Sequence, residues 1–259
     1  MTRVIKLGGT LLEDPDRLDR LCREIVRFAQ EGPLVVVHGG GRRVTEMARR
    51  CGLTPHFADG LRVTDGDMLE IVRMVLAGSV NTALVAALAA AGARAVGLTG
   101  GDGAAAVAEP LRSGGGVDLG HVGRVLEVRT ELLEHLLGAG FLPVLSPLAV
   151  GASGTWLNIN ADQMAAATAR ALRADHLIFL TDVDGVLGED GAVVPWLPVS
   201  DARRLIETGT VRGGMRPKLE ACGEALDGGV PEVLILPGAQ AHLLAAGIPM
   251  DRCGTRLTP

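Results

Sequence analysis

Short apolar runs alternate along this chain with longer amphipathic segments. The runs are rich in Val and Leu and lack polar alternation, which is typical of strands buried on both faces of a sheet. We expect six such strands, at residues 4–7, 34–37, 95–98, 142–145, 177–180 and 233–236. The segments between them predict helices at residues 16–30, 43–51, 67–91, 131–137, 162–172, 201–207 and 218–226.

This alternation predicts the fold class. Strands that alternate with helices form mainly parallel sheets with helices on both faces, so we expect an α/β protein with three αβα layers. Short hairpins at residues 104–128 and 149–159 are expected to decorate the edge of the sheet. We expect a single domain over residues 1–259, with two halves that meet near residue 160.

Glycine-containing turns follow four of the predicted strands, at residues 8–10, 38–41, 99–103 and 181–185. Ligands bind at the carboxyl ends of strands in parallel sheets, and exposed glycine amides at turns and helix starts bind phosphate or carboxylate. We therefore expect a row of N–H groups that face an anion. We interpret His38, within the second turn, as a packed strand-end residue rather than a base.

Composition excludes several classes of function. The net charge is −5 and no basic block occurs, which argues against nucleic acid as a partner. The four cysteines form no C-x-x-C pair and the histidines have no metal-site spacing, so we expect reduced thiols and no protein metal site. Residues 136–157 are uncharged, but glycine and proline interrupt them, so we expect no membrane span. With no signal peptide before the first strand, we expect a cytoplasmic protein.

Lysine occurs only at Lys6 and Lys218, whereas arginine occurs twenty-three times. A lysine ammonium is a compact point charge that a planar guanidinium cannot replace between anionic oxygens. Both lysines lie beside glycine-rich turns, which together predict a phosphate site. Pro217 suits the first turn of a helix. It therefore places Lys218 at a helix start, where a cation is unfavourable unless an anion is bound.

The segment from Asn158 to Gln163 predicts a helix start. Asn160 and Gln163 fit a variant capping box, with Asn160 as the cap and Gln163 reaching back to it. Asp162 then lies in the first turn. Asn158 lies outside the cap and is a candidate donor to a ligand, and Arg62 is a candidate partner for a ligand carboxylate.

Together these motifs resemble the amino acid kinase family over essentially the whole chain, in order and in spacing. The segments that carry the resemblance are IKLGG (5–9), VHGGG (37–41), DGLRVTD (59–65), LAG (76–78), GDG (101–103), LGHVG (119–123), NINADQ (158–163), LTDVDGVL (180–187), GMRPK (214–218) and GTR (254–256). GLRVTD and NINADQ are the most specific, because they distinguish this chain from aspartokinases and uridylate kinases.

The resemblance implies an enzyme that transfers a phosphoryl group from ATP to the γ-carboxylate of N-acetyl-L-glutamate, the second step of arginine synthesis. It implies that residues 1–160 bind acetylglutamate and residues 161–259 bind ATP, with Mg²⁺ held through the nucleotide phosphates. Arginine-inhibited relatives have an extra N-terminal helix that this sequence lacks. We therefore expect a homodimer that is insensitive to arginine.

The resemblance also implies which residues form the site. The two phosphate-neutralising lysines and the carboxylate that orients them are Lys6, Lys218 and Asp162. The substrate-binding residues are Gly9, Gly40, Gly41, Arg62 and Asn158. The nucleotide-binding residues are Gly8, Asp182, Gly185, Val186, Leu187, Thr210, Arg212 and Gly214.

Two alternatives stay open at this stage. A sister kinase that acts on the aminoadipate or glutamate tail of a carrier protein would share the glycine turns and both lysines. Arg42, Arg43 and Arg216 would suit such a carrier. A catalytically silent nucleotide- or effector-binding protein of the same fold is the second alternative. It should have lost a catalytic residue, whereas all three are present here.

Overall fold

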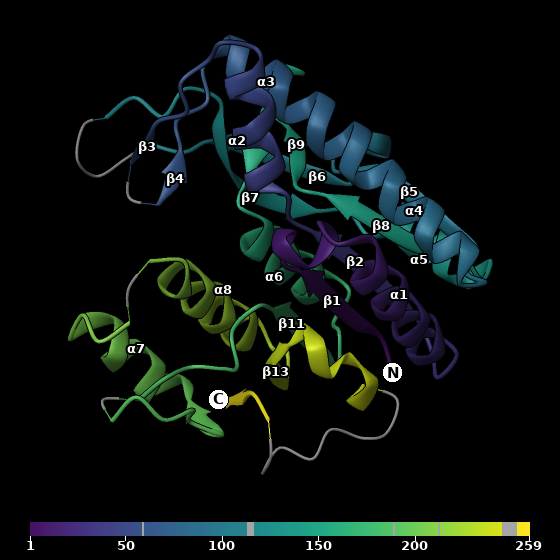
Figure 1. Cartoon of the computed structure of the whole chain (residues 1–259), viewed down its shortest axis with the longest axis vertical. Coiled ribbons are helices and arrows are strands. Elements are labelled where there is room, and N and C mark those ends of the chain that lie inside the picture. Colours follow the sequence, from purple (N-terminus) through teal and green to yellow (C-terminus); the bar gives the residue numbers. More distant parts are fainter. Residues whose placement is uncertain (59, 113–116, 189, 212, 245–252) are drawn as a thin grey trace.

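An eight-stranded sheet runs through the protein (Figure 1). The computed structural model describes residues 1–58, 60–112, 117–188, 190–211, 213–244 and 253–259. In spatial order the strands are β12 (Trp196–Pro198), β14 (Thr255–Thr258), β13 (Glu232–Pro237), β11 (His176–Thr181), β1 (Arg3–Leu7), β2 (Leu34–His38), β8 (Leu142–Ser146) and β5 (Ala95–Thr99). Neighbours are parallel except β13 and β14. The six predicted strands are confirmed, and β12 and β14 were not predicted.

All seven predicted helices are present, with ends shifted by up to three residues. They are α1 (Pro15–Ala29), α2 (Gly41–Arg50), α3 (Gly66–Arg73) with α4 (Asn81–Ala90), α5 (Glu131–Gly138), α6 (Ala161–Ala171), α7 (Val199–Glu207) and α8 (Met215–Asp227). The run predicted as one helix contains a π-helix, η2 (Met74–Val80), between α3 and α4. Short 3₁₀ helices are η1 (Gly9–Leu12), η3 (Asp102–Ala104) and η4 (Gly238–Leu243).

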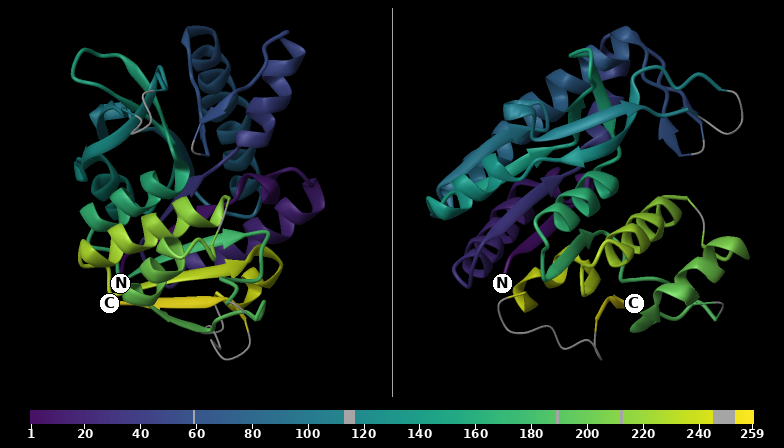
Figure 2. Two further views of the ribbon diagram at one scale, coloured as in Figure 1. Left: turned by 90° about the vertical axis from the view of Figure 1, so that its left-hand side faces the viewer. Right: turned by 180° about the vertical axis from the view of Figure 1, so that it is seen from behind.

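The three-layer arrangement follows from the two-residue period of the strands. Val4 packs with α6 and α8 in one core cluster, whereas Ile5 and Leu7 pack with α1 and α4 in a second cluster on the other face. Lys6 has the same parity as Val4, so its side chain points toward the α6 and α8 face. The expected αβα sandwich is therefore confirmed. Figure 2 shows the N-terminal half (purple to teal) on one side and the C-terminal half (green to yellow) on the other.

The predicted hairpins are present but do not lie along the edge of the main sheet. Strands β6 (Ala106–Pro110), β7 (Val122–Val128), β9 (Leu148–Val150) and β10 (Trp156–Ile159) close into a small four-stranded barrel. A two-stranded hairpin, β3 (Phe57–Ala58) and β4 (Leu61–Arg62), lies nearby in the N-terminal half (Figure 1). These additions place β4 and β10 beside the carboxyl ends of the central strands.

One helical run in the described part of the chain, Gly66–Ala90, is long and apolar enough to cross a membrane by length and composition. Its side chains Ile71, Val75 and Leu84 are buried in the core cluster that covers one face of the sheet. We therefore interpret the run as a core helix of this α/β fold.

Candidate active site

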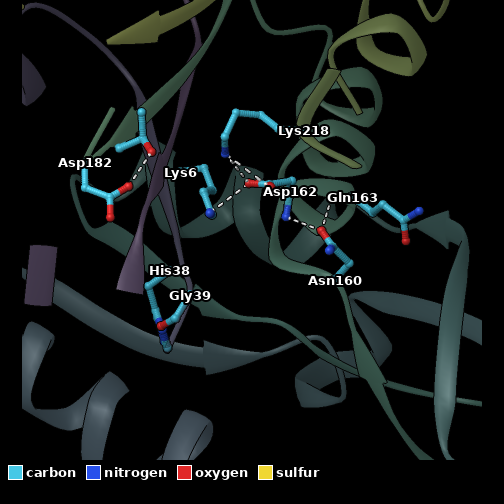
Figure 3. Close-up of polar contacts among 9 residues, drawn as sticks. Lys6, His38, Gly39, Asn160, Asp162, Gln163, Asp182 and Lys218 are labelled. Atoms are coloured by element: carbon cyan, nitrogen blue, oxygen red, sulfur yellow. Dashed lines mark hydrogen bonds and ion pairs between the residues drawn. The ribbon is translucent and has the colours of Figure 1, made fainter. Parts of the chain in front are cut away.

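Lys6, Asp162 and Lys218 form one buried charged cluster (Figure 3). The Nζ atom of Lys6 lies 2.8 Å from Asp162 Oδ1. The Nζ atom of Lys218 lies 3.2 Å from both carboxylate oxygens of Asp162. All three residues are less than one-tenth exposed: Lys6 is 8%, Asp162 7% and Lys218 6% exposed. Two ammonium groups thus share one carboxylate, which leaves a net positive charge in a buried place.

Three elements bring these groups together. Strand β1 supplies Lys6 at its carboxyl end, and the start of α6 supplies Asp162. Asn160 caps α6, because its Oδ1 accepts from the N–H of Asp162 at 2.8 Å and of Gln163 at 3.2 Å. Lys218 lies in the first turns of α8, with Pro217 at the third helical position, as the sequence predicts. Helices α6 and α8 face each other with small buried side chains, which brings them close; these are Ala165, Ala166, Ala169, Ala221 and Ala225.

The charges in this cluster perturb one another. Burial alone would raise the pKa of Asp162, but the charges and hydrogen bonds of Lys6 and Lys218 hold that pKa below its usual range. Burial and the nearby Lys6 charge lower the pKa of Lys218, although Asp162 opposes this shift. Asp162 is therefore ionised at neutral pH and orients both ammonium groups.

A cavity of about 270 Å³ opens beside the cluster. It is lined by seven of the predicted site residues: Lys6, Gly9, Gly40, Gly41, Arg62, Asn158 and Asp162. Gly9 and Gly41 are the first residues of η1 and α2, so their N–H groups have no partner within those helices. The cavity therefore joins N–H donors, the Lys6 ammonium and a guanidinium, a set suited to an anionic ligand, whereas Lys218 does not line it.

Arg62 is held with part of its guanidinium unpaired. Its Nη2 donates to the carbonyl of Gly41 at 2.7 Å and to Thr45 Oγ1 at 2.9 Å. The guanidinium lies 4.7 Å from the centre of the Phe57 ring. Among the described residues, the buried Nη1 atom has no hydrogen-bond partner. A buried unpaired cationic donor is costly, so this atom is placed to receive a ligand carboxylate.

Asn158 depends on a residue that sequence reasoning missed. Its Nδ2 donates to Thr64 Oγ1 at 3.1 Å, and Thr64 Oγ1 donates to the carbonyl of Arg62 at 2.8 Å. Thr64 is fully buried. It thus links the two predicted substrate-binding residues. The only signal in the sequence is its place within GLRVTD, two residues after Arg62.

Two expectations from the sequence are wrong in part. In the turn at residues 99–103, the N–H of Gly100 already donates to Leu148 O and the N–H of Gly101 to Thr99 Oγ1, and Gly101 packs under the Trp156 ring. Those glycines serve close packing against β9 and β10. Gln163 does not complete the capping box either: its side-chain Oε1 is buried without a partner among the described residues, and Figure 3 shows it pointing away from Asn160.

None of the described residues that were predicted to bind the nucleotide lines the cavity, and all of them except Gly8 lie in the C-terminal half. Gly8 N–H donates to Leu180 O at 2.8 Å, which ties the first glycine turn to the end of β11. Val186 is fully buried and its N–H donates to Thr255 Oγ1, whereas Leu187 is 52% exposed. The remaining residues are exposed or lie at turns near β11 and α8; they are Asp182, Gly185, Thr210 and Gly214. Arg212 lies outside the described residues.

A protein-bound metal has no evident place in the part of the chain that the structure describes. No group of three or more His, Cys, Asp or Glu side chains there could hold a metal ion. The only carboxylate in the buried cluster, Asp162, is already paired with two ammonium groups.

Fold and site together define an α/β protein in which two lysines share one buried carboxylate at the carboxyl edge of a parallel sheet. Residues 1–237 match the amino acid kinase family, and the chain belongs to this family. It is 44% identical over 259 residues to the acetylglutamate kinase of Acidobacterium capsulatum, covering 100% of this chain and 97% of that protein. It is 45% identical over 251 residues to the acetylglutamate kinase of Rhodopseudomonas palustris, covering 93% and 84%.

Solved structures show the same fold. The N-acetylglutamate synthase of Neisseria gonorrhoeae, solved with coenzyme A and N-acetyl-glutamate, matches with a TM-score of 0.87 and 31% identity. The match covers all of this chain but only 59% of the synthase. A carbamate kinase from Giardia matches with a TM-score of 0.73 at 20% identity, which supports the fold alone.

Proposed function

We propose that this protein transfers the γ-phosphoryl group of ATP to the γ-carboxylate of N-acetyl-L-glutamate, giving N-acetylglutamyl 5-phosphate and ADP in arginine biosynthesis. The observation that carries the proposal is the buried Lys6–Asp162–Lys218 cluster beside a cavity that also holds Arg62. The similarity to named acetylglutamate kinases over nearly the whole chain supports this acceptor.

The chemistry requires positioning and charge neutralisation more than covalent catalysis. The acceptor carboxylate is ionised at neutral pH, so the reaction needs no general base. Lys6 and Lys218 neutralise charge on the transferring phosphoryl group from two sides. Asp162 holds both ammonium groups in place and takes no proton during the reaction. The N–H groups of Gly9, Gly40 and Gly41 add donors that require no reorganisation during the transfer.

Substrate selection rests on the N-terminal half in this proposal. Arg62 Nη1 binds the α-carboxylate of acetylglutamate, and Asn158, held by Thr64, donates beside it. The same cavity is lined by apolar side chains that suit the acetyl group and the aliphatic part of the substrate; they include Val72, Leu76 and Ile159.

The C-terminal half binds ATP in this proposal, through the turn that follows β11 and the loop before α8. The residues assigned to ATP binding are Gly8 of the N-terminal half and Asp182, Gly185, Val186, Leu187, Thr210, Arg212 and Gly214 of the C-terminal half. Mg²⁺ would be held mainly by phosphate oxygens of ATP and by water, as is usual for this ion in nucleotide sites. When bound, it neutralises charge on the nucleotide phosphates.

The product provides a direct test. An acyl phosphate reacts with hydroxylamine to give a hydroxamate, which a colour reaction with iron detects. We expect hydroxamate to form from Mg-ATP and free N-acetyl-L-glutamate. Its absence with the free amino acid, together with transfer to a carrier-protein tail, would favour the sister kinase. ATP binding without any transfer would favour a silent binding protein.

Replacing Arg62 by lysine is expected to raise the KM for N-acetyl-L-glutamate by about 10–100-fold. One ammonium cannot replace both the loop contacts of Nη2 and the free Nη1, and a charged hydrogen bond contributes about 1.5–3 kcal/mol. Steady-state kinetics with varied acceptor measure the change. Arg42→Lys is the control, because the Arg42 side chain is 64% exposed and pairs with Glu13. Equal effects of the two changes would contradict the assignment of Arg62.

Replacing Gly9 by alanine is expected to lower kcat strongly while the chain still folds. A Cβ atom at position 9 would lie 2.8 Å from the backbone N of Gly40, so the two glycine loops must separate. The N–H donors would then move away from the transferring phosphoryl group, with a loss of about 10²-fold for one such donor. Gly78→Ala is the control, because a Cβ there meets nothing within 4 Å. Unchanged kcat in Gly9→Ala would show that the close approach is unnecessary.

We also propose that the protein acts as a homodimer in the cytoplasm. Strand β5 lies at one end of the main sheet, and an uncovered edge strand can pair with another chain. The neighbouring helix α4 exposes small side chains with little charge, including Ala83, Ala86 and Ala90. Light scattering should give about twice the 26.8 kDa chain mass. A monomer or a hexamer would contradict the proposal.

A further inference from the structure

A buried polar chain lies outside the charged cluster and reaches the second glycine loop. It consists of His38, the last residue of β2, and Asn81, the first residue of α4, which are 0% and 4% exposed. His38 Nδ1 lies 2.9 Å from the carbonyl oxygen of Gly39, and His38 Nε2 lies 3.1 Å from Asn81 Nδ2. Asn81 Nδ2 also donates to Val144 O at 3.0 Å. The interpretation of His38 as a packed strand-end residue accounts for none of these bonds.

The partners define where the protons lie. A carbonyl oxygen only accepts, so His38 Nδ1 carries the hydrogen that bonds to Gly39. His38 Nε2 is then the acceptor, and one N–H of Asn81 Nδ2 donates to it while the other donates to Val144. Burial lowers the pKa of His38 to about 4, although the bond to Gly39 opposes the shift, so the ring is neutral at physiological pH.

Neighbouring elements are shaped to keep Asn81 in place. A Cβ atom on Gly97 of β5 would lie 2.0 Å from Asn81 Oδ1, so only glycine leaves room for this amide. Asn81 directly follows the π-helix η2, whose Leu76 and Val80 lie against Gly40; a Cβ there would meet them at 2.7 and 3.3 Å. The junction of η2 and α4 therefore contacts the glycine loop through both apolar and polar groups.

The geometry of one peptide unit links the hydrogen-bonded pair of His38 and Asn81 to the active site. The carbonyl of Gly39 and the N–H of Gly40 belong to the same planar peptide, which is trans because the structure has no cis bonds among its described residues. The two groups therefore point in opposite directions. Anchoring the Gly39 oxygen to His38 fixes the direction of the Gly40 N–H, whose nitrogen lies beside Gly9 at the cavity. A peptide between two glycines has little other restraint.

We propose that His38, held in one tautomer by Asn81, is a positioning residue that fixes the Gly39–Gly40 peptide and aims the Gly40 N–H at the transferring phosphoryl group. The inference rests on the proposed phosphoryl transfer. His38 touches no substrate and moves no proton. Its effect belongs to kcat, because the α-carboxylate that anchors acetylglutamate is bound elsewhere, at Arg62.

Two replacements of His38 separate this role from packing. Asparagine places an amide near the position of Nδ1 and can still donate to Gly39, but it loses the contact with Asn81. Glutamine places its amide near the position of Nε2 and keeps that contact, but it gives up the bond to Gly39. We expect His38→Asn to retain kcat within about tenfold and His38→Gln to lose about 10²-fold, the effect of one such donor. In both variants the KM for N-acetyl-L-glutamate should stay within about threefold.

A glutamine variant as active as the asparagine variant, or more active, would overturn the proposal. Asn81→Leu, of similar size, removes the amide that bonds to His38. Its kcat should fall without a matching rise in KM, and an unchanged kcat would count against the role of Asn81. The ring ¹⁵N shifts of His38 in the wild-type protein give a readout without turnover. We expect hydrogen on Nδ1 and none on Nε2. The reverse tautomer would overturn this inference even if the enzyme is active, whereas an inactive enzyme with the expected tautomer would point to failure of the proposed function.

Discussion

Lys218→Ala should lower kcat by about 10²–10³, the usual cost of removing one group that stabilises charge in the transition state. The ammonium of Lys218 lies 3.2 Å from both oxygens of Asp162 and 4.9 Å from the centre of the Phe179 ring, so no other side chain can take its place without rearrangement. The KM for N-acetyl-L-glutamate should change little, because the acceptor is bound at Arg62. Steady-state ADP release measures both constants.

Two further variants make this expectation specific. Lys218→Arg should not restore the rate, because a wide, planar guanidinium cannot place a compact point charge where the Lys218 ammonium lies. Arg216→Ala removes a nearby positive charge whose side chain is 62% exposed and pairs with Glu220. It should leave kcat within about threefold, since exposed ion pairs contribute little. Near-normal turnover in Lys218→Ala would refute the role of Lys218.

Asp162→Asn should both inactivate and destabilise the protein. It leaves Lys6 and Lys218, each more than nine-tenths buried, as two ammonium groups without a carboxylate. Removing one partner of a buried ion pair costs about 3–5 kcal/mol in the free energy of unfolding. Denaturant unfolding at neutral pH measures this loss. Asp227→Asn is the control, because its pair with Arg203 is exposed and should change stability by less than about 1 kcal/mol.

The destabilisation in Asp162→Asn should depend on pH. The folded protein holds the pKa of Asp162 below its unfolded value of about 3.9, so its contribution to stability is present above that value. The contribution is lost as the pH falls through the lower, folded-state pKa. The stability difference between the wild type and Asp162→Asn should therefore be largest near neutral pH and shrink in acid. A difference that grows in acid would contradict the assigned charge state.

Most of the fold could be predicted, because buried parallel strands have a strong sequence signal. Strands Leu34–His38 and His176–Thr181 are mostly apolar, and their predicted ends differ from the observed ends by at most one residue. Strand β14 (Thr255–Thr258) has no such signal, since it is short and mostly polar. It is stabilised by antiparallel pairing with β13. The π-helix η2 was missed because seven apolar and small residues look alike in α- and π-helical periods.

The parts of the candidate site that could be predicted are those where only one residue type suits the chemistry. Lys6 and Lys218 stand out in a chain that otherwise uses arginine, and the structure brings both onto Asp162. Roles that depend on tertiary neighbours could not be predicted. Thr64 and Asn81 act through hydrogen bonds to residues far away in the sequence. The third glycine turn was misjudged because only the structure shows the β9 and β10 residues packed against it.

The most direct test of the central claim is ADP release from Mg-ATP with free N-acetyl-L-glutamate, beside glutamate and aspartate as acceptors. We expect rapid turnover with N-acetyl-L-glutamate and little with the two unacetylated amino acids. Turnover with glutamate or aspartate instead would contradict the assigned acceptor. No turnover with any of the three, while ATP still binds, would contradict the proposed function.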